Sequence, residues 1–148
     1  MDGRRREPEI TIINDQKLHR IRNDVYRRFV GSIIGERGMK ADQVSILFTD
    51  DDGMRKYNRE YRHEDRTTDV ISFPAGEKNM EGLINIGDII ISVPTAFRQA
   101  RRAGWSMEKE IKKLLVHGLL HLTGFDHETD RGTMKEMEDA ICKKLIAG

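Results

Sequence analysis

Three histidines, His117, His121 and His127, lie within one short stretch, although the 148 residues of the chain contain only five histidines. The first two are four positions apart, and on a helix that spacing places both imidazoles on one face, about 5–6 Å apart at Cβ. Gly124 lies between the second and the third and can adopt the positive φ that ends a helix, so that His127 would return to the same point. Three neutral imidazoles suit one Zn²⁺ and leave its fourth tetrahedral position for a water molecule, which is typical of a catalytic zinc site.

The spacing H-x-x-x-H-x-x-G-x-x-H also occurs in the metzincin zinc peptidases, where a glutamate follows the first histidine. In this chain that position is Gly118. The peptidase glutamate is the general base that removes a proton from the attacking water. Its absence argues against peptide hydrolysis, and a metzincin-like zinc peptidase or other zinc hydrolase stays as an alternative.

The elements that must position this motif begin with four β-rich segments, which alternate with helical patterns along most of the chain. Strands are predicted at residues 10–14, 44–48, 70–73 and 86–92. Pro74 is expected to stop the third strand, because proline removes a backbone donor. The charged, glycine-bearing residues 75–82 should then form a loop.

Helices are expected between and after these strands, each beginning at a residue whose side chain can accept a hydrogen bond from the first turn. The predicted N-caps are Asp15, a residue of the run Asp50-Asp51-Asp52, Ser92 and Ser106. The first helix should run from Asp15 to the glycines that begin at Gly31, and Ser106 should start the helix that carries the histidines. A last helix carries Met134, Met137, Ile141 and Leu145 at helical spacing.

Strands that alternate with helices favour an α/β fold, with α+β-like character in its helical last third. The prediction is a small, mostly parallel but mixed four-stranded sheet, packed with about five to six helices and carrying a metzincin-like zinc site. Residues 1–148 are expected to form a single domain, with residues 1–8 as a loose tail.

The composition argues against several classes of protein. Charged residues make up 34% of the chain and hydrophobic residues 37%, and the net charge is +1, so no overall field indicates a nucleic-acid partner. Binding of that kind would need a local basic patch. The sequence has no apolar segment of the length that spans a membrane, and its first residues lack the apolar core of a signal peptide. A single cysteine, Cys142, excludes an internal disulfide, so we expect a cytoplasmic protein with no membrane association.

Residues 117–127, HGLLHLTGFDH, closely resemble the signature H-G-x-L-H-L-x-G-[YF]-D-H of the YbeY family, the bacterial ribosomal RNA maturation factors. Three further blocks match this family. They are Tyr61-Arg62 with residues 68–74 (TDVISFP), residues 83–92 with Gly87-Asp88-Ile89, and Glu136-Met137. Thr67 departs from the family, which commonly has proline there. The resemblance covers roughly residues 55–140, and the amino-terminal part of the chain carries no matching signature.

The resemblance implies a zinc-dependent endoribonuclease that prefers single-stranded RNA. Members act in ribosome biogenesis, notably in maturation of the 3′ end of 16S ribosomal RNA in the small subunit, and in ribosome quality control. By position, His117, His121 and His127 would bind one Zn²⁺, and Arg62 would be the arginine implicated in activity. The implied partners are ribosomal RNA, the small ribosomal subunit and ribosome-associated proteins. A non-enzymatic ribosome-associated factor, in which the metal only braces the fold, is a further alternative.

Two routes to phosphodiester cleavage stay open from these residues. Zn²⁺ can lower the pKa of its bound water toward ~7 so that the water attacks, or it can polarise a phosphoryl oxygen while the ribose 2′-OH attacks. The planar guanidinium of Arg62 would hold the phosphate or stabilise charge in the transition state. Gly118 is expected to leave space beside the metal for an RNA strand.

A basic segment around Arg62 supplies further candidates for RNA contacts, with Tyr57 and Tyr61 interleaved. Cations bind phosphates and aromatic rings stack on the bases of single-stranded RNA, but a solvated helix face with its tyrosines packed inward has the same pattern. The candidate cations are Arg55, Lys56, Arg59 and Arg66. Three aspartates could accept the second N–H of a ligand imidazole, or could serve only turns and strand ends. These are Asp126, Asp69 and Asp88.

Overall fold

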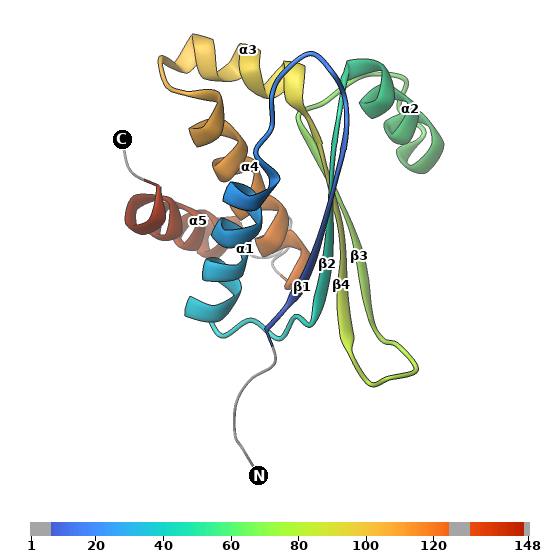
Figure 1. Ribbon diagram of the computed structural model, residues 1–148, viewed down its shortest axis with the longest axis vertical. Helices are drawn as coiled ribbons and strands as arrows, with labels where there is room; N and C mark the ends of the chain where they lie inside the picture. Colours follow the sequence, from blue (N-terminus) through green and yellow to red (C-terminus); the bar gives the residue numbers. More distant parts are fainter. Residues whose placement is uncertain (1–6, 125–130, 147–148) are drawn as a thin grey trace.

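The computed structural model describes residues 7–124 and 131–146, within which five helices surround one four-stranded mixed sheet (Figure 1). The strands are β1 (Glu9–Asp15), β2 (Gln43–Thr49), β3 (Val70–Lys78) and β4 (Ile84–Ser92). The helices are α1 (Asn23–Glu36), α2 (Asp51–Arg62), α3 (Val93–Ala103), α4 (Met107–Leu122) and α5 (Arg131–Leu145). The predicted α/β class with a mixed sheet is therefore confirmed. The tail predicted for residues 1–8 falls almost wholly outside the described ranges.

The sheet has the strand order β1-β2-β4-β3, in which β1, β2 and β4 are parallel and β3 is an antiparallel edge strand. The prediction that Pro74 stops the third strand was wrong, because β3 continues to Lys78. An edge strand tolerates a residue without a backbone donor. The register shifts between Pro74 and Glu77, opposite Gly87, which has a φ of 128°. A Cβ atom at position 87 would lie 2.1 Å from the carbonyl oxygen of Phe73, so this close approach of the two strands requires glycine.

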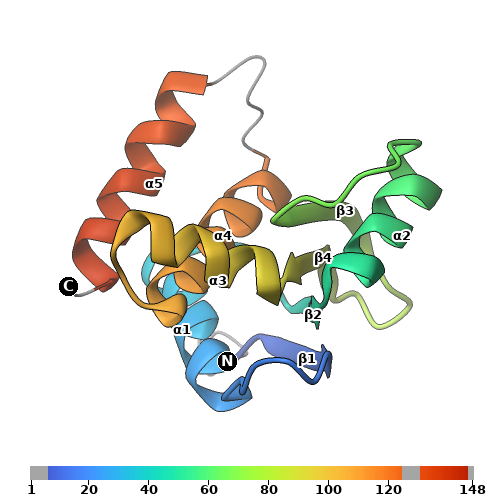
Figure 2. The same cartoon turned by 90° about the horizontal axis from the view of Figure 1, so that it is seen from above.

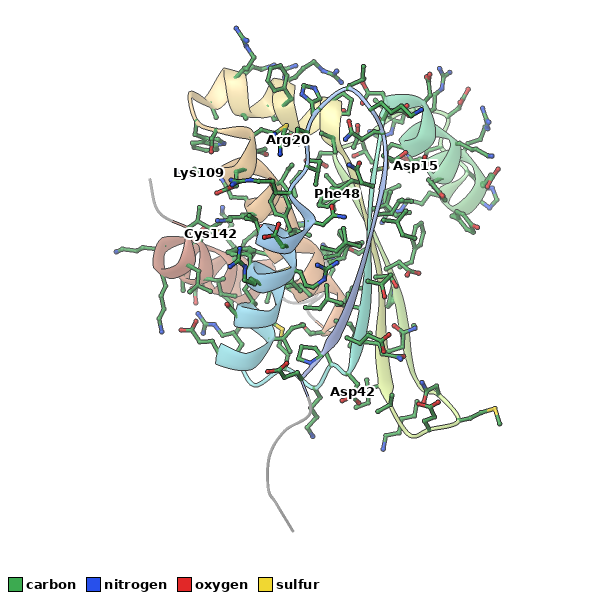
Figure 3. All side chains as sticks on the ribbon, viewed as in Figure 1. Asp15, Arg20, Asp42, Phe48, Lys109 and Cys142 are labelled. Atoms are coloured by element: carbon green, nitrogen blue, oxygen red, sulfur yellow. The ribbon has the colours of Figure 1, made fainter. Side chains whose placement is uncertain are left out.

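The helices cover the two faces of the sheet unequally (Figure 2). On one face, α1, α4 and α5 bury the main core, into which Phe48 of β2 points (Figure 3). Phe48 is fully buried, with its ring centroid 5.4 Å from that of Tyr26 on α1. On the other face, Met54 of α2 covers a smaller apolar cluster with Ile71 and Ile90. Within residues 7–124 and 131–146, no helix is long and apolar enough to cross a membrane.

Side-chain caps begin three of the helices as predicted. Asp50, Ser92 and Ser106 each accept a hydrogen bond from the backbone N–H three positions further along the chain. These contacts satisfy donors that have no partner within the helix, which is why the starts of α2, α3 and α4 could be located from sequence.

The first helix differs from its prediction at both ends. It begins at Asn23 rather than after Asp15, and it continues through Gly31 to Glu36. The Oε1 atom of Gln16 accepts hydrogen bonds from the backbone N–H groups of Leu18 and His19. This local turn satisfies the backbone in a conformation other than a helix and thereby delays the start of α1.

Gly118 determines how closely α4 approaches the sheet. A Cβ atom at this position would lie 3.0 Å from two carbon atoms of Ile89 on β4, and the Ile89 side chain has no exposed surface. Gly118 follows His117 by about 100° around the helix, which turns it from the histidine face toward the sheet. The expectation that this glycine opens space for a substrate was wrong, because Ile89 occupies that side.

Candidate active site

His117 and His121 lie side by side on α4, as their spacing predicts. Their ring centroids are 4.7 Å apart and their ring planes are inclined by 67°. Both residues are partly buried, at the border between the core-facing side of the helix and solvent. The helix therefore holds two imidazole rings side by side on a rigid backbone.

Glu138 of α5 contacts His117 from the neighbouring helix, with its Oε1 atom 3.1 Å from Nδ1 of His117. The two side chains are only 19% and 28% exposed. An ionised carboxylate accepts hydrogen bonds and cannot donate them, so the contact is a hydrogen bond from Nδ1–H of His117 to Glu138, and Nε2 is the ring nitrogen that could bind a metal. Glu138 was not predicted from the sequence, although it shares the inward side of α5 with Met134 and Ile141.

Charged and aromatic contacts hold the first turns of α4. Nε1 of Trp105 donates to Glu110 at 2.9 Å, and the ammonium groups of Lys109 and Lys113 lie 4.6 and 4.5 Å from the Trp105 ring centroid. Glu110 and Lys113 also line a cavity of about 160 Å³ beside His117, which we call the histidine cavity. Its remaining lining residues are Asp69, Val70, Leu114 and Glu138. The cavity thus joins the start of α4 to α5 and to the edge strand β3.

Asp69 and Asp88, each a candidate either for contact with a ligand imidazole or for strand-end hydrogen bonding, lie on different sides of the sheet. Asp69 lines the histidine cavity, and its Oδ1 atom accepts a hydrogen bond from the Val70 N–H at 2.7 Å. Asp88 lines a hollow on the opposite face together with Ile90, because its neighbour Ile89 packs toward α4 and side chains alternate along a strand. The structure therefore brings Asp69 to the cavity beside His117 and does not bring Asp88 there.

The third predicted ligand, His127, and the neighbouring Asp126 lie outside the described residues. In the part of the chain that the structure describes, no group of three potential ligand side chains could hold a metal ion. Gly124 has a φ of 104°, in agreement with the turn predicted after α4. Two imidazoles, one of them oriented by a carboxylate, suit the nitrogen preference of zinc, so the donors present fit the predicted metal.

Arg62, the predicted phosphate contact, is the exposed last residue of α2. His63 follows it with a φ of 58° and ends the helix. Over residues 7–124 and 131–146 the Arg62 side chain makes no ion pair, and it is not part of the lining of the histidine cavity. The structure therefore leaves this guanidinium exposed to solvent and does not bring it directly to the histidines.

The other predicted RNA-contacting arginines are paired with acidic residues of the loop that follows α2. Arg55 binds Asp65 through two hydrogen bonds, of 2.8 and 3.2 Å, and Arg59 lies 3.6 Å from the same carboxylate. Arg66 pairs with Glu64 at 2.8 Å. A hydrogen bond from Arg55 is the main reason that the pKa of Asp65 lies below its ordinary value. These exposed pairs reduce the charge available to RNA, and Lys56 has no ion pair among the described residues.

The two tyrosines of α2 line a hollow of about 700 Å³ on the sheet face opposite the histidines. Tyr57 and Tyr61 are stacked with centroids 6.2 Å apart, and the Tyr61 ring meets Phe73 edge-on at 5.3 Å. Tyr57 is partly buried and Tyr61 is 61% exposed. Tyr57 therefore fits the interpretation in which the tyrosines pack inward, and Tyr61 fits the one in which an exposed ring stacks on RNA bases.

A helix that presents paired imidazoles beside the antiparallel edge of a mixed sheet defines a small α/β protein with a histidine-based candidate active site. The sequence model of the family described as Endoribonuclease YbeY matches residues 7–146. The chain belongs to the YbeY family of endoribonucleases, which are RNA-cleaving hydrolases. The resemblance predicted from four short sequence blocks is thereby confirmed.

Individual relatives agree with this assignment. The Endoribonuclease YbeY of Aquifex aeolicus (strain VF5) is 39% identical over 132 residues, which cover 87% of each chain. That of Nautilia profundicola is 44% identical over 102 residues, covering 69% of this chain and 71% of the relative. The solution structure of TM1509 from Thermotoga maritima aligns with a TM-score of 0.65 at 22% identity, covering 92% of this chain and 88% of that one, and supports the fold alone.

Proposed function

We propose that this protein is a zinc-dependent endoribonuclease that cleaves single-stranded RNA. The observation that carries the proposal is the pair His117 and His121 on α4, with Glu138 against Nδ1 of His117, in a chain of the YbeY family. The substrate that we propose is the 3′ end of 16S ribosomal RNA, with a further role in ribosome quality control. The small ribosomal subunit and ribosome-associated proteins would then be its partners, in the cytoplasm.

The proposed chemistry assigns separate tasks to the side chains. His117, His121 and His127 would hold the metal, and Glu138 keeps the His117 ring in the orientation that presents Nε2. A bound zinc ion would supply Lewis-acid activation of the phosphodiester. Arg62 would donate hydrogen bonds to the phosphate oxygens, since a guanidinium matches them in charge and shape.

The peptidase alternative finds no support in the described residues. The general base of the metzincins would stand at position 118, where the Cβ direction leads to Ile89 and the buried sheet. Gly118 has no side chain that could act as this base. We therefore keep phosphodiester cleavage as the single proposed reaction.

Metal removal provides the direct test of the proposed function. Zinc-loaded protein is expected to cleave an end-labelled single-stranded RNA, and chelation should lower the rate by on the order of a hundredfold or more, with recovery on adding Zn²⁺. Thermal unfolding of both forms should accompany the assay. Equal cleavage by loaded and metal-free protein would refute the metal dependence, and unfolding on chelation would favour a metal that only braces the fold.

Glu138 should contribute to metal affinity although it is not predicted to bind the metal. Glu138→Ala is expected to weaken zinc binding by roughly 10- to 100-fold, because the His117 ring loses the acceptor that fixes its tautomer. Glu138→Gln keeps an acceptor oxygen and should lose less. Competition with a chromophoric chelator measures the affinity, and Glu136→Ala, an exposed glutamate on the same helix, is the matched control. An unchanged affinity of Glu138→Ala would show that the contact does not orient the ring.

A further inference from the structure

A second cavity adjoins the candidate active site and has no part in the chemistry described so far. It has a volume of about 280 Å³ and lies between α3 and the segment that leads into β3. Asp69 lines both this cavity and the histidine cavity, so the two are neighbours. We call it the α3 groove. An RNA strand that extended from the histidine cavity past Asp69 would enter the α3 groove.

Two arginines line the α3 groove. Arg98 and Arg102 lie one turn apart on α3, with Gln99 between them, and Thr67 and Thr68 line the opposite wall with their hydroxyl groups donating to Asp51 and Asp69. The carboxylate in the lining, Asp69, already accepts hydrogen bonds from the Val70 N–H and the Thr68 hydroxyl. Two guanidinium groups line the groove, one of them paired with Asp51, and the planar fork of arginine matches phosphate oxygens.

One of the two arginines is held in place before any ligand arrives. Nη2 of Arg98 donates to Asp51 at 2.8 Å and to the Thr95 hydroxyl at 3.0 Å. Burial alone would raise the pKa of Asp51, but hydrogen bonds from Ser92, Thr95 and Arg98 outweigh that effect and lower it. Asp51 is therefore ionised at neutral pH and anchors the Arg98 guanidinium, which reduces the conformational entropy lost on binding.

Arg102 carries a positive charge that takes no part in the hydrogen bonds around Asp51. It is exposed in the last turn of α3 and lines the α3 groove, and it makes no ion pair in the described part of the chain. Arg98 thus provides a fixed donor beside Asp51, and Arg102 provides a guanidinium without an ion pair among the described residues, one turn away in the lining of the same groove.

We propose that the α3 groove is a phosphate subsite that binds the backbone of the RNA strand next to the position of cleavage. This inference rests on the proposed function and adds to it a substrate-positioning site formed by Arg98 and Arg102. Neither residue belongs to the sequence blocks that carry the family resemblance. The subsite would set the register of the strand at the histidines without taking part in bond cleavage.

Binding of a short fluorescent single-stranded RNA to the full chain tests the subsite. Every protein in this experiment carries His121→Ala, which prevents cleavage of the RNA. Adding Arg102→Glu is expected to weaken binding by about five- to tenfold at low salt. The slope of log K against log salt concentration should fall in magnitude by about 0.7, the value for one phosphate contact on a single strand. Arg102→Lys keeps the positive charge and should retain most of the affinity.

Arg101→Glu is the matched control, because it makes the same charge change one residue away on the same helix. Arg101 is exposed and its guanidinium lies over the Phe97 ring, 5.7 Å from the centroid, outside the lining of the groove. We expect less than about a twofold loss of affinity for this variant. Equal losses in Arg101→Glu and Arg102→Glu would indicate a general field effect and overturn the subsite.

The binding experiment distinguishes failure of the proposed endoribonuclease function from failure of the phosphate subsite. If the His121→Ala protein binds no RNA under any salt condition, the proposed function fails and the subsite fails with it. If that protein binds RNA and Arg102→Glu binds equally well, only the subsite is overturned. Thermal unfolding of each variant should stay near that of the parent, since both arginines are exposed on the helix surface.

Discussion

Replacing His121 with alanine is expected to reduce the cleavage of single-stranded RNA by about a hundred- to a thousandfold, with little loss of fold stability. The substitution removes one of the two imidazoles that α4 presents together, 4.7 Å from its partner ring. The side chain is partly exposed and lies at the border of the core, so its loss should cost about 1 kcal/mol of unfolding free energy. Cleavage rates and thermal unfolding, measured on the same preparations, check the two parts of this expectation.

His19→Ala is the control for this experiment. His19 lies before α1 and packs its ring against Phe97 of α3, at a centroid distance of 4.6 Å, away from the histidine face of α4. The control should retain the cleavage rate of the unsubstituted protein. Full activity of His121→Ala would remove the histidine pair from the mechanism, and unfolding of that variant would support the alternative of a structural metal.

Gly118→Glu, which introduces the residue that metzincins carry at this position, is expected to destabilise the fold by at least about 4 kcal/mol. The new side chain would start 3.0 Å from Ile89 and would direct a carboxylate into the contact between α4 and β4. A buried charge without a partner costs several kcal/mol, a large part of the roughly 5–15 kcal/mol by which domains are stable. Denaturant unfolding, or the yield of folded protein, measures the effect.

Gly35→Glu separates this packing effect from the general effect of replacing a helical glycine. Gly35 also lies inside a helix, α1, and a Cβ atom there would meet nothing within 4 Å. The control should change stability by less than about 1 kcal/mol, because glutamate is a better helix former than glycine and the site is exposed. Similar stabilities of the two variants would show that α4 can move away from the sheet without cost.

The elements that the sequence predicted correctly are those whose signals are local. Asp50, Ser92 and Ser106 cap helices through bonds to groups three positions away. The i, i+4 spacing of His117 and His121 needs only a helix to bring the rings together. Where a competing local contact was overlooked, as with the Gln16 side chain before α1, the predicted helix start was wrong by several residues.

Two features depend on the place of a segment in the sheet, which cannot be read from the segment's own sequence. Pro74 lies within β3 because that strand is at the edge and its register shifts opposite Gly87. Asp88 faces away from the histidines because Ile89 is the residue that packs on α4. The direction of Asp88 could have been predicted from the alternation of side chains along a strand, since an isoleucine in the core places its neighbour on the other face.

Periodicity, caps and motif spacing are properties of short segments, so the class of fold, the helix that carries the histidines and the family could all be predicted from the amino-acid sequence. The side chains that surround those histidines come from separate elements and could not be predicted in this way. Glu138 reaches His117 from another helix, Asp65 neutralises arginines that looked available to RNA, and Asp69 joins the histidine cavity to the α3 groove. Such contacts depend on how helices and strands pack against one another, and packing is decided by the whole core rather than by any one segment.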